Sequence, residues 1–302
     1  MINFQRLDFA RKKEYDRLLQ NCGERGCEYS FANLYMWGRQ DAAILGDDLL
    51  IFSQFNRQSI YPFPLIRSDA KTVLDAIIAD AHSRKIRCRL TSLTPSDCDL
   101  LEQLYPGRFR FYPDRDGYDY VYNIDDLADL KGRKFQKKRN HLNRFRENHP
   151  DCRAVPLNQD LLPLAQQVVA QWQSGDGCSD PESENYLECR ALHRAFRHFE
   201  ELGLEGMVLL EGETPIAMPM GSRLSEDTFD VHFEKALDVD GAYAAINWEF
   251  SNYLQGKYPE LRYLNREDDL GLPGLRKAKL SYCPDHFIEK AWARFVEDDD
   301  ED

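Results

Sequence analysis

The sequence predicts a mixed α/β protein that consists of two α/β domains. A chain of 302 residues has the length of about two ordinary domains. Helical and strand-like patterns of apolar residues alternate along both halves of the chain. Hydrophobic residues make up 42% and aromatic residues 12% of the chain, which provides material for two cores and argues against intrinsic disorder. We therefore expect two globular domains with a similar order of elements.

The first half contains the elements of one domain. Residues 11–20 and 29–37 have helical patterning, and residues 41–54 predict two strands joined by a turn at residues 46–48. Val73, Ala76, Ile77 and Ala81 lie at helical spacing within a predicted helix over residues 69–82. The remaining predictions are a strand at 86–93, a helix at 95–104 and strands at 108–113 and 118–124. Together they predict an N-terminal domain over residues 1–124.

The second half repeats this plan after a basic segment. Its first elements are a strand at 152–157, helices at 161–172 and 189–199, and a hairpin at 207–220 with its turn at 211–214. A strand at 228–236, a helix at 241–254 and a strand at 262–265 follow. The last elements are a short helix at 274–279 and a final strand at 281–292. We therefore assign a connecting helix to residues 125–150 and a C-terminal domain to residues 151–296. Residues 297–302 are all acidic and are expected to form a solvated tail.

Composition excludes several classes of protein. No run approaches the roughly 18 to 20 apolar residues of a membrane-spanning helix, so no integral membrane segment is expected. The charged N-terminus does not fit a signal peptide. The eight cysteines include no CxxC pair, so we predict reduced thiols, no metal site and a cytoplasmic location. The net charge of −13 disfavours general binding of nucleic acid.

Residues 131–146 (KGRKFQKKRNHLNRFR) are an exception within this acidic chain because they contain eight basic residues and no acid. In a helix, Phe135, Leu142 and Phe145 form an apolar stripe, and most of the polar residues lie on the opposite face. This face suits a phosphate backbone, but it also suits a solvated helix whose charges neutralise an acidic neighbour. The residues predicted to contact RNA are Arg133, Lys137, Lys138, Arg139, Asn140, His141 and Arg144.

The strand at 228–236 carries candidate proton-transfer groups. Asp230, His232 and Glu234 alternate with apolar residues, so regular pleating places all three on one face. If that face borders a substrate, His232 and Glu234 could exchange protons with an incoming amine. The alternative is the ordinary wet face of a surface strand.

Two segments that follow strands are candidates for substrate binding. Gly241 lies at the start of a predicted helix, where free N–H groups could bind an anion or a carbonyl oxygen, although Asp240 could simply cap the helix. The stretch NREDDLGLPGLRKAKLSY at 265–282 follows the last inner strand, at the edge where α/β sheets bind ligands. Its charges could instead form an internal network of ion pairs.

Three stretches of the chain together resemble one family. KGRKFQKKRNHLNRF, HFEKALDVDGAYAAIN and YLNREDDLGLPGLRKAKLSY resemble the family of phosphatidylglycerol lysyltransferase C-terminal domains. The resemblance implies two tandem GNAT-like acyltransferase folds with mixed, mostly antiparallel sheets, similar in plan to Fem-type aminoacyl transferases. It also implies that Tyr282 is a general acid. The segment LDVDGAYAA lacks the Gln or Arg that opens a pyrophosphate-binding loop, which argues against coenzyme A as the donor.

The function expected from these observations is acyl or aminoacyl transfer without a bound cofactor, with aminoacyl-tRNA as the donor and an unknown amine or hydroxyl acceptor. The expected catalytic residues are Glu234, Tyr282, Glu267 and His232. The expected substrate-binding residues are Asn265, Arg266, Asp268, Gly241, Asn247, Arg276 and Lys279. Two alternatives stay open: a non-enzymatic module that binds RNA or protein on the same scaffold, and a CoA-dependent N-acetyltransferase.

Overall fold

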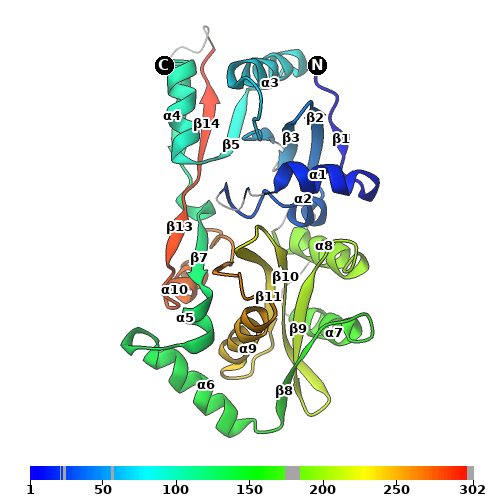
Figure 1. The fold of residues 1–302 in the computed structure, drawn as a ribbon, viewed down its shortest axis with the longest axis vertical. Helices are drawn as coiled ribbons and strands as arrows, with labels where there is room; N and C mark the ends of the chain where they lie inside the picture. The colour runs from blue at the N-terminus through cyan, green and yellow to red at the C-terminus, as the bar shows by residue number, and fades with distance from the viewer. Residues whose placement is uncertain (21, 23–24, 56–57, 174–183, 298–302) are drawn as a thin grey trace. The chain divides into compact units, whose positions relative to one another are not determined.

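A computed structural model describes residues 1–20, 22, 25–55, 58–173 and 184–297 of the chain. The chain divides into two units, whose elements are labelled in Figure 1. The first unit contains Met1–Asp119, Asp268–Gly271 and the chain from Ile288 onward, and the second contains Tyr120–Glu267 and Leu272–Phe287. Each unit is thus assembled from segments distant in sequence. This division differs from the continuous ranges 1–124 and 151–296 that the sequence predicts.

The sheet of the first unit has seven strands among the described residues. Their order is β1 (Gln5–Arg6), β2 (Gln40–Leu45), β3 (Asp48–Phe55), β4 (Gln58–Pro62), β5 (Arg89–Leu93), β14 (Ala291–Phe295) and β6 (Phe109–Pro113). The helices of this unit are α1 (Lys12–Leu19), α2 (Phe31–Trp37), α3 (Ala70–Arg84) and α4 (Pro95–Leu104). Neighbouring strands pair antiparallel except for β4 and β5, which are parallel.

Local sequence explains where the helices of the first unit begin. The side chain of Thr94 accepts a hydrogen bond from the backbone of Asp97, whose carboxylate bonds back to Thr94, so a complete capping box starts α4. The predicted apolar stripe of α3 is confirmed, because Val73, Ile77 and Ala81 are all buried in the core of this unit.

The sheet of the second unit also has seven strands in the part of the chain that the structure describes. Their order is β13 (His286–Ile288), β7 (Asp119–Asn123), β12 (Tyr263–Asn265), β11 (Thr228–Ala236), β10 (Thr214–Arg223), β9 (Glu205–Glu211) and β8 (Cys152–Pro156). The helices are α5 (Ile124–Asp129), α6 (Gln136–Asn148), α7 (Leu162–Gln173), α8 (Glu184–Arg197), α9 (Ala242–Lys257) and α10 (Pro273–Leu280). The pair β11–β12 is parallel, while β12 pairs antiparallel with β7.

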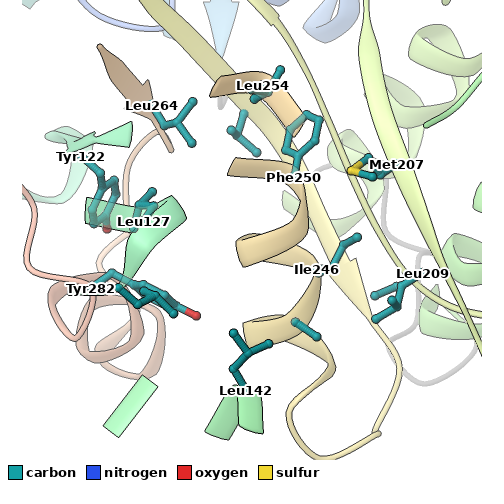
Figure 2. Close-up of a cluster of buried hydrophobic side chains, with 14 of the residues drawn as sticks. Tyr122, Leu127, Leu142, Met207, Leu209, Ile246, Phe250, Leu254, Leu264 and Tyr282 are labelled. Carbon is teal, nitrogen blue, oxygen red and sulfur yellow. The ribbon is translucent and has the colours of Figure 1, made fainter. Parts of the chain in front are cut away.

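Helix α9 forms the centre of the core of the second unit. Ile246, Phe250 and Leu254 lie one turn apart on its buried face. Figure 2 shows this face beside Met207 and Leu209 of β9, which belong to the same buried cluster. Helix α9 therefore sets the positions of the side chains that pack between it and the sheet.

The end of the chain differs from the single strand predicted at 281–292. It forms two short strands, because β13 joins the sheet of β7 whereas β14 pairs with β5 and β6 in the other sheet. Between them, the ammonium of Lys290 is buried and lies 2.5 Å from Asp119 and 2.8 Å from Glu28. A charged residue held by two carboxylates interrupts the apolar alternation of a strand. The strands β1 and β4 were not predicted. The range 125–150, predicted as one connecting helix, contains the two helices α5 and α6, and Leu130 and Gly132 between them have positive φ angles.

Three composition-based predictions can be compared with the structure. Every helix in the described part of the chain is too short or too polar to span a bilayer. Cys189 on α8 is disulfide-bonded, contrary to the prediction that the thiols are reduced. The six cysteines that are present as thiols in the described structure are Cys22, Cys27, Cys88, Cys98, Cys152 and Cys283. The predicted acidic tail lies outside the described residues from residue 298 onward.

Candidate functional site

The candidate site begins where two parallel strands of the second unit part. Pairing between β11 and β12 extends from Thr228–Tyr263 to Asp230–Asn265, and β11 then continues to Ala236 beyond the end of β12. The loop after Asn265 therefore runs beside the half of β11 that no longer pairs with β12, and Arg266 and Glu267 of this loop contact Glu234 and His232. This is the edge at which the sequence predicts a ligand site.

A β-bulge in β11 lies at this point. Between the pairs Met220–Phe233 and Ser222–Asp230, one residue of β10 faces two residues of β11. The β10 residue is Gly221, and a Cβ atom at this position would lie 2.0 Å from the carbonyl oxygen of Asp230. The bulge thus requires glycine because the two backbones approach so closely.

We expect Gly221→Ala to destabilise the protein by about 1 to 3 kcal/mol, because the added methyl group must push β10 away from β11. Urea unfolding monitored by tryptophan fluorescence would measure the change. Gly256→Ala on α9 is the matched control, since a Cβ there meets no atom within 4 Å and alanine favours the helix. Equal stability of the two variants would contradict the account of the bulge.

The bulge separates Glu234 from Asp230 and His232, although the sequence predicts all three on one face of the strand. His232 turns toward β10 and the loop, with Nε2 2.8 Å from Ser222 Oγ and Nδ1 3.1 Å from Glu267 Oε1. Asp230 Oδ2 lies 3.3 Å from the same Nδ1 atom. Glu234 instead contacts α9 and Arg266. The prediction of a shared face therefore holds for Asp230 and His232 and is wrong for Glu234, because the extra residue of the bulge reverses the alternation.

We call Ser222, Asp230, His232 and Glu267 the His232 cluster. The side chains of His232 and Asp230 are fully buried, whereas that of Glu267 is 17% exposed. Buried polar groups of this kind are stabilised by their mutual hydrogen bonds. The cluster ties β10 and β11 to the loop that carries Arg266.

Glu234 and Arg266 form the centre of a second group of side chains. Glu234 Oε2 accepts hydrogen bonds from Arg266 Nε at 2.8 Å and from Nη2 at 2.5 Å, and its Oε1 accepts one from Asn247 Nδ2 at 3.0 Å. Arg266 Nη1 and Asn247 Oδ1 are buried and have no hydrogen-bond partner within the described part of the chain. One donor and one acceptor are thus left for a ligand.

Two aromatic rings and a lysine complete this group. The Arg266 guanidinium lies 5.0 Å from the ring of Tyr282 and 5.4 Å from that of Tyr122. Lys138 Nζ lies 3.6 Å from the Tyr282 ring. Figure 2 shows both tyrosines in the core beside α9. We call the set of Tyr122, Lys138, Glu234, Asn247, Arg266 and Tyr282 the Arg266 cluster.

Burial and charge shift the pKa values of Lys138 and Tyr282 in opposite directions. Burial lowers the pKa of Lys138 to about 8, and the positive charge of Arg266 acts in the same direction. Burial raises the pKa of Tyr282 to about 12, although Arg266 opposes this change. Near neutral pH the cluster therefore contains a lysine that can readily lose a proton and a tyrosine that retains one.

The loop that carries Arg266 is fixed through its backbone. Lys279 Nζ donates to the carbonyl oxygens of Arg266 at 2.5 Å and Glu267 at 3.1 Å. Asn265 Oδ1 accepts from Glu267 N at 2.8 Å, and Glu267 has a positive φ of 53°. Lys279 and Asn265, which the sequence predicts as substrate-binding residues, thus shape the loop around Arg266.

The other predicted binding residues lie outside these two clusters. Asp268 belongs to the first unit, where its carboxylate accepts from Leu270 N at 3.1 Å. Arg276 lies on α10, one turn before Lys279. Gly241 precedes α9 with a φ of 88°, and a Cβ there would lie 2.9 Å from Phe145 Cβ of α6. Gly241 therefore permits close packing of α6 against the start of α9.

Helix α6 confirms the apolar stripe predicted for the basic segment, because Phe135, Leu142 and Phe145 are buried. Its basic residues differ from one another. Arg139 Nη1 donates to the carbonyl oxygens of Leu130 and Gly132, and Arg144 pairs with Asp240 at 2.7 Å. The predicted RNA-contacting residues that are exposed are Arg133, Lys137, Asn140, His141 and Arg144.

Sequence reasoning did not assign Tyr122 or Ser222 to the site, and it assigned Lys138 to RNA. A signal for Lys138 was present, since it lies three residues after Phe135 and four before Leu142 on the apolar stripe. A lysine in such a position is directed toward the core. Tyr122 and Ser222 carry no comparable local signal.

Comparison with protein families and solved structures places the chain among known proteins. The model of the family "Phosphatidylglycerol lysyltransferase, C-terminal" matches residues 20–294. A conserved protein of unknown function from Bacteroides thetaiotaomicron is 38% identical and has a TM-score of 0.90, with 98% of this chain and 100% of that chain covered. An uncharacterized protein of Mycoplasmoides gallisepticum is 24% identical over 182 residues, which span 59% of this chain and 56% of that protein.

More distant structures share the fold. The L-PGS structure from Bacillus licheniformis is 15% identical with a TM-score of 0.67, covering 97% of this chain and 93% of that one. FemX is 10% identical with a TM-score of 0.59 and covers 98% of both chains. A tandem GNAT protein of clavulanic acid biosynthesis is 9% identical with a TM-score of 0.52, covering 99% and 100%. The predicted tandem GNAT-like fold with mostly antiparallel sheets is confirmed.

Proposed function

The chain belongs to the family of phosphatidylglycerol lysyltransferase C-terminal domains, and from this membership and the Arg266 cluster we propose that it transfers an aminoacyl group from aminoacyl-tRNA to an amine or hydroxyl acceptor. Family and fold support an acyl or aminoacyl transferase. The finer proposal, an aminoacyl group carried by tRNA, depends on the chemistry of the Arg266 cluster and of α6.

The observation that carries the proposal is the unpaired donor and acceptor next to Glu234. An aminoacyl ester offers a carbonyl oxygen that can accept from Arg266 Nη1 and an ammonium group that can donate to Asn247 Oδ1. The carboxylate of Glu234 lies beside both residues and favours a cation there. An acetyl group has no ammonium and would leave the acceptor unpaired. The cluster thus favours an aminoacyl over an acetyl donor.

Lys138 and Tyr282 are suited to move the protons of the transfer. The acceptor gives its proton to the neutral form of Lys138 Nζ while its lone pair forms a bond to the ester carbonyl carbon. The ester C–O bond then breaks, and the leaving ribose oxygen takes a proton from the Tyr282 hydroxyl. Proton return from Lys138 to Tyr282 restores both groups, and Lys138 Nζ lies 3.6 Å from the centre of the Tyr282 ring.

The glutamates named by the sequence have positioning roles in this scheme. Both carboxylate oxygens of Glu234 already accept hydrogen bonds, so Glu234 orients Arg266 and Asn247. Glu267 bonds to His232, and the His232 cluster holds the loop that carries Arg266. The exposed residues Arg133 and Lys137, on the segment that also carries Lys138, would contact the phosphates of the tRNA.

The test compares binding of three forms of one tRNA on filters across a salt series: aminoacylated, N-acetyl-aminoacylated and uncharged. We expect the aminoacylated form to bind at least about tenfold more tightly than the N-acetylated form, because acetylation removes the ammonium group. Acetyl-CoA should not compete. Equal affinity for all three forms, or competition by acetyl-CoA, would contradict an aminoacyl-tRNA donor.

A variant of Asn247 tests whether this residue recognises the ammonium group. Asn247→Leu removes the unpaired acceptor and should abolish the preference for the free ammonium without abolishing tRNA binding. Lys131→Met is the control, because Lys131 is exposed and pairs only with Asp129 in the described structure. A preference that survives in Asn247→Leu would show that another group recognises the ammonium.

A further inference from the structure

Three side chains with metal-ligand chemistry meet in the second unit where α6 ends and β8 begins. His149 follows the last residue of α6, Cys152 is the first residue of β8 and Glu211 is the last residue of β9. One ligand atom from each residue lies within 4.8 Å of the other two. This group is separate from the residues of the Arg266 cluster.

The backbone fixes the positions of all three residues. Cys152 and Glu211 are direct partners in the antiparallel pair β8–β9, so their side chains leave the sheet on the same face. The backbone N–H of Cys152 donates to the carbonyl oxygen of His149 at 3.1 Å, which closes the turn between helix and strand. The His149 ring stacks on Phe145 with centroids 4.7 Å apart. Ligands held on such rigid elements suit a metal site.

We propose that His149, Cys152 and Glu211 bind a divalent transition-metal ion of the zinc class. One imidazole nitrogen, one thiolate sulfur and one carboxylate oxygen form a set that Zn²⁺ and Co²⁺ accept in tetrahedral geometry, with a fourth position for water. Mg²⁺ and Ca²⁺ prefer oxygen ligands alone. The ion replaces the thiol proton and the hydrogen bond of 2.6 Å between His149 Nδ1 and Glu211 Oε1.

The exposure of the ligand side chains and the effect of a bound ion on α6 both fit a metal site. The side chain of His149 is 20% exposed and that of Glu211 is 44% exposed, so an ion can reach them from solvent. The bound ion joins the end of α6 to the edge of the sheet. Because α6 also carries Lys138, metal binding stabilises the helix that contributes to the Arg266 cluster.

Titration of the full chain with Co²⁺ tests the site, since tetrahedral Co²⁺ with a thiolate ligand has characteristic charge-transfer and d–d absorption. We expect one equivalent to bind, Zn²⁺ to displace it, and both ions to raise the melting temperature. Cys152→Ser should lose the charge-transfer band, whereas Cys98→Ser on α4, also a half-buried thiol, should retain it.

Glu211→Gln provides a second test that keeps the thiol and the imidazole. It should weaken Co²⁺ binding by at least about tenfold, as expected for the loss of a ligand. A protein without cobalt absorption, or one whose spectrum is the same in Cys152→Ser, would overturn the proposal. His149 and Glu211 would then form only an ion pair.

Discussion

Replacing Lys138 by methionine is expected to slow aminoacyl transfer by about 100-fold or more, because a positioned general base typically contributes factors of 10² to 10⁴. Methionine retains the length and apolar character of the lysine stem. It can therefore still cover the Tyr282 ring, against which Lys138 Nζ lies at 3.6 Å. The loss should appear in single-turnover transfer from aminoacyl-tRNA to an added amine acceptor.

The pKa of Lys138 also predicts the direction in which the transfer rate changes with pH. The lowered pKa of Lys138, about 8, means that the neutral, proton-accepting form increases as the pH rises through 8. The wild-type rate should therefore rise with pH and level off above that value. Lys138→Met should remove this rise. A Lys138→Met enzyme with the wild-type profile would assign the base to another residue.

The same substitution is expected to stabilise the fold. The pKa of Lys138 is lower in the folded than in the unfolded chain, so the unfolded state binds more protons between the two pKa values. Stability due to this group thus rises with pH through that window, and below pH 8 the buried ammonium is unfavourable. At pH 7 Lys138→Met should increase the free energy of unfolding by about 1 kcal/mol after allowance for partial exposure.

A variant that is slower but more stable is difficult to explain by damage to the fold. Lys131→Met, the exposed control on the same basic segment, should change neither the transfer rate nor the stability appreciably. If Lys138→Met instead lowers both stability and rate, Lys138 has a structural role, and the proposed proton transfer loses its support.

Much of the fold followed from apolar periodicity, because most elements carry their own signal. The helix α4 was predicted with the bounds that the structure shows, since Thr94 and Pro95 mark its start in the sequence. The strand β11 was likewise predicted over residues 228–236. By contrast, β1 has only two residues and depends on β2 for its conformation, so no local pattern identifies it.

The polar face of β11 could not be predicted from β11 alone. Regular alternation places Asp230, His232 and Glu234 together, but the bulge is defined by Gly221 on the neighbouring strand. Predicting this bulge requires knowledge of the register between β10 and β11. Arg266 and Tyr282 were named as site residues, whereas their partner Tyr122 comes from a strand more than 100 residues earlier, and only the packing of the second unit brings it near.

Glu234→Gln is expected to lower the free energy of unfolding by about 3 kcal/mol, because it leaves the guanidinium of Arg266 with no compensating charge. The two side chains are only 11% and 15% exposed, so water cannot replace the lost carboxylate well. Urea unfolding would measure the change. Glu260→Gln, which breaks an exposed pair with Arg223, is the control and should cost less than about 1 kcal/mol.

The double variant Glu234→Gln/Arg266→Met separates the structural from the functional role of this pair. Removal of both charges should restore most of the stability lost in Glu234→Gln, since a buried ion pair can often be replaced by neutral groups at little cost. It should not restore the preference for aminoacylated over uncharged tRNA, because the free N–H of Arg266 is gone. A stable double variant that still distinguishes charged tRNA would assign recognition of the ester to other residues. A stable double variant that no longer distinguishes charged from uncharged tRNA would show that the buried charge of Arg266 serves to bind the ligand.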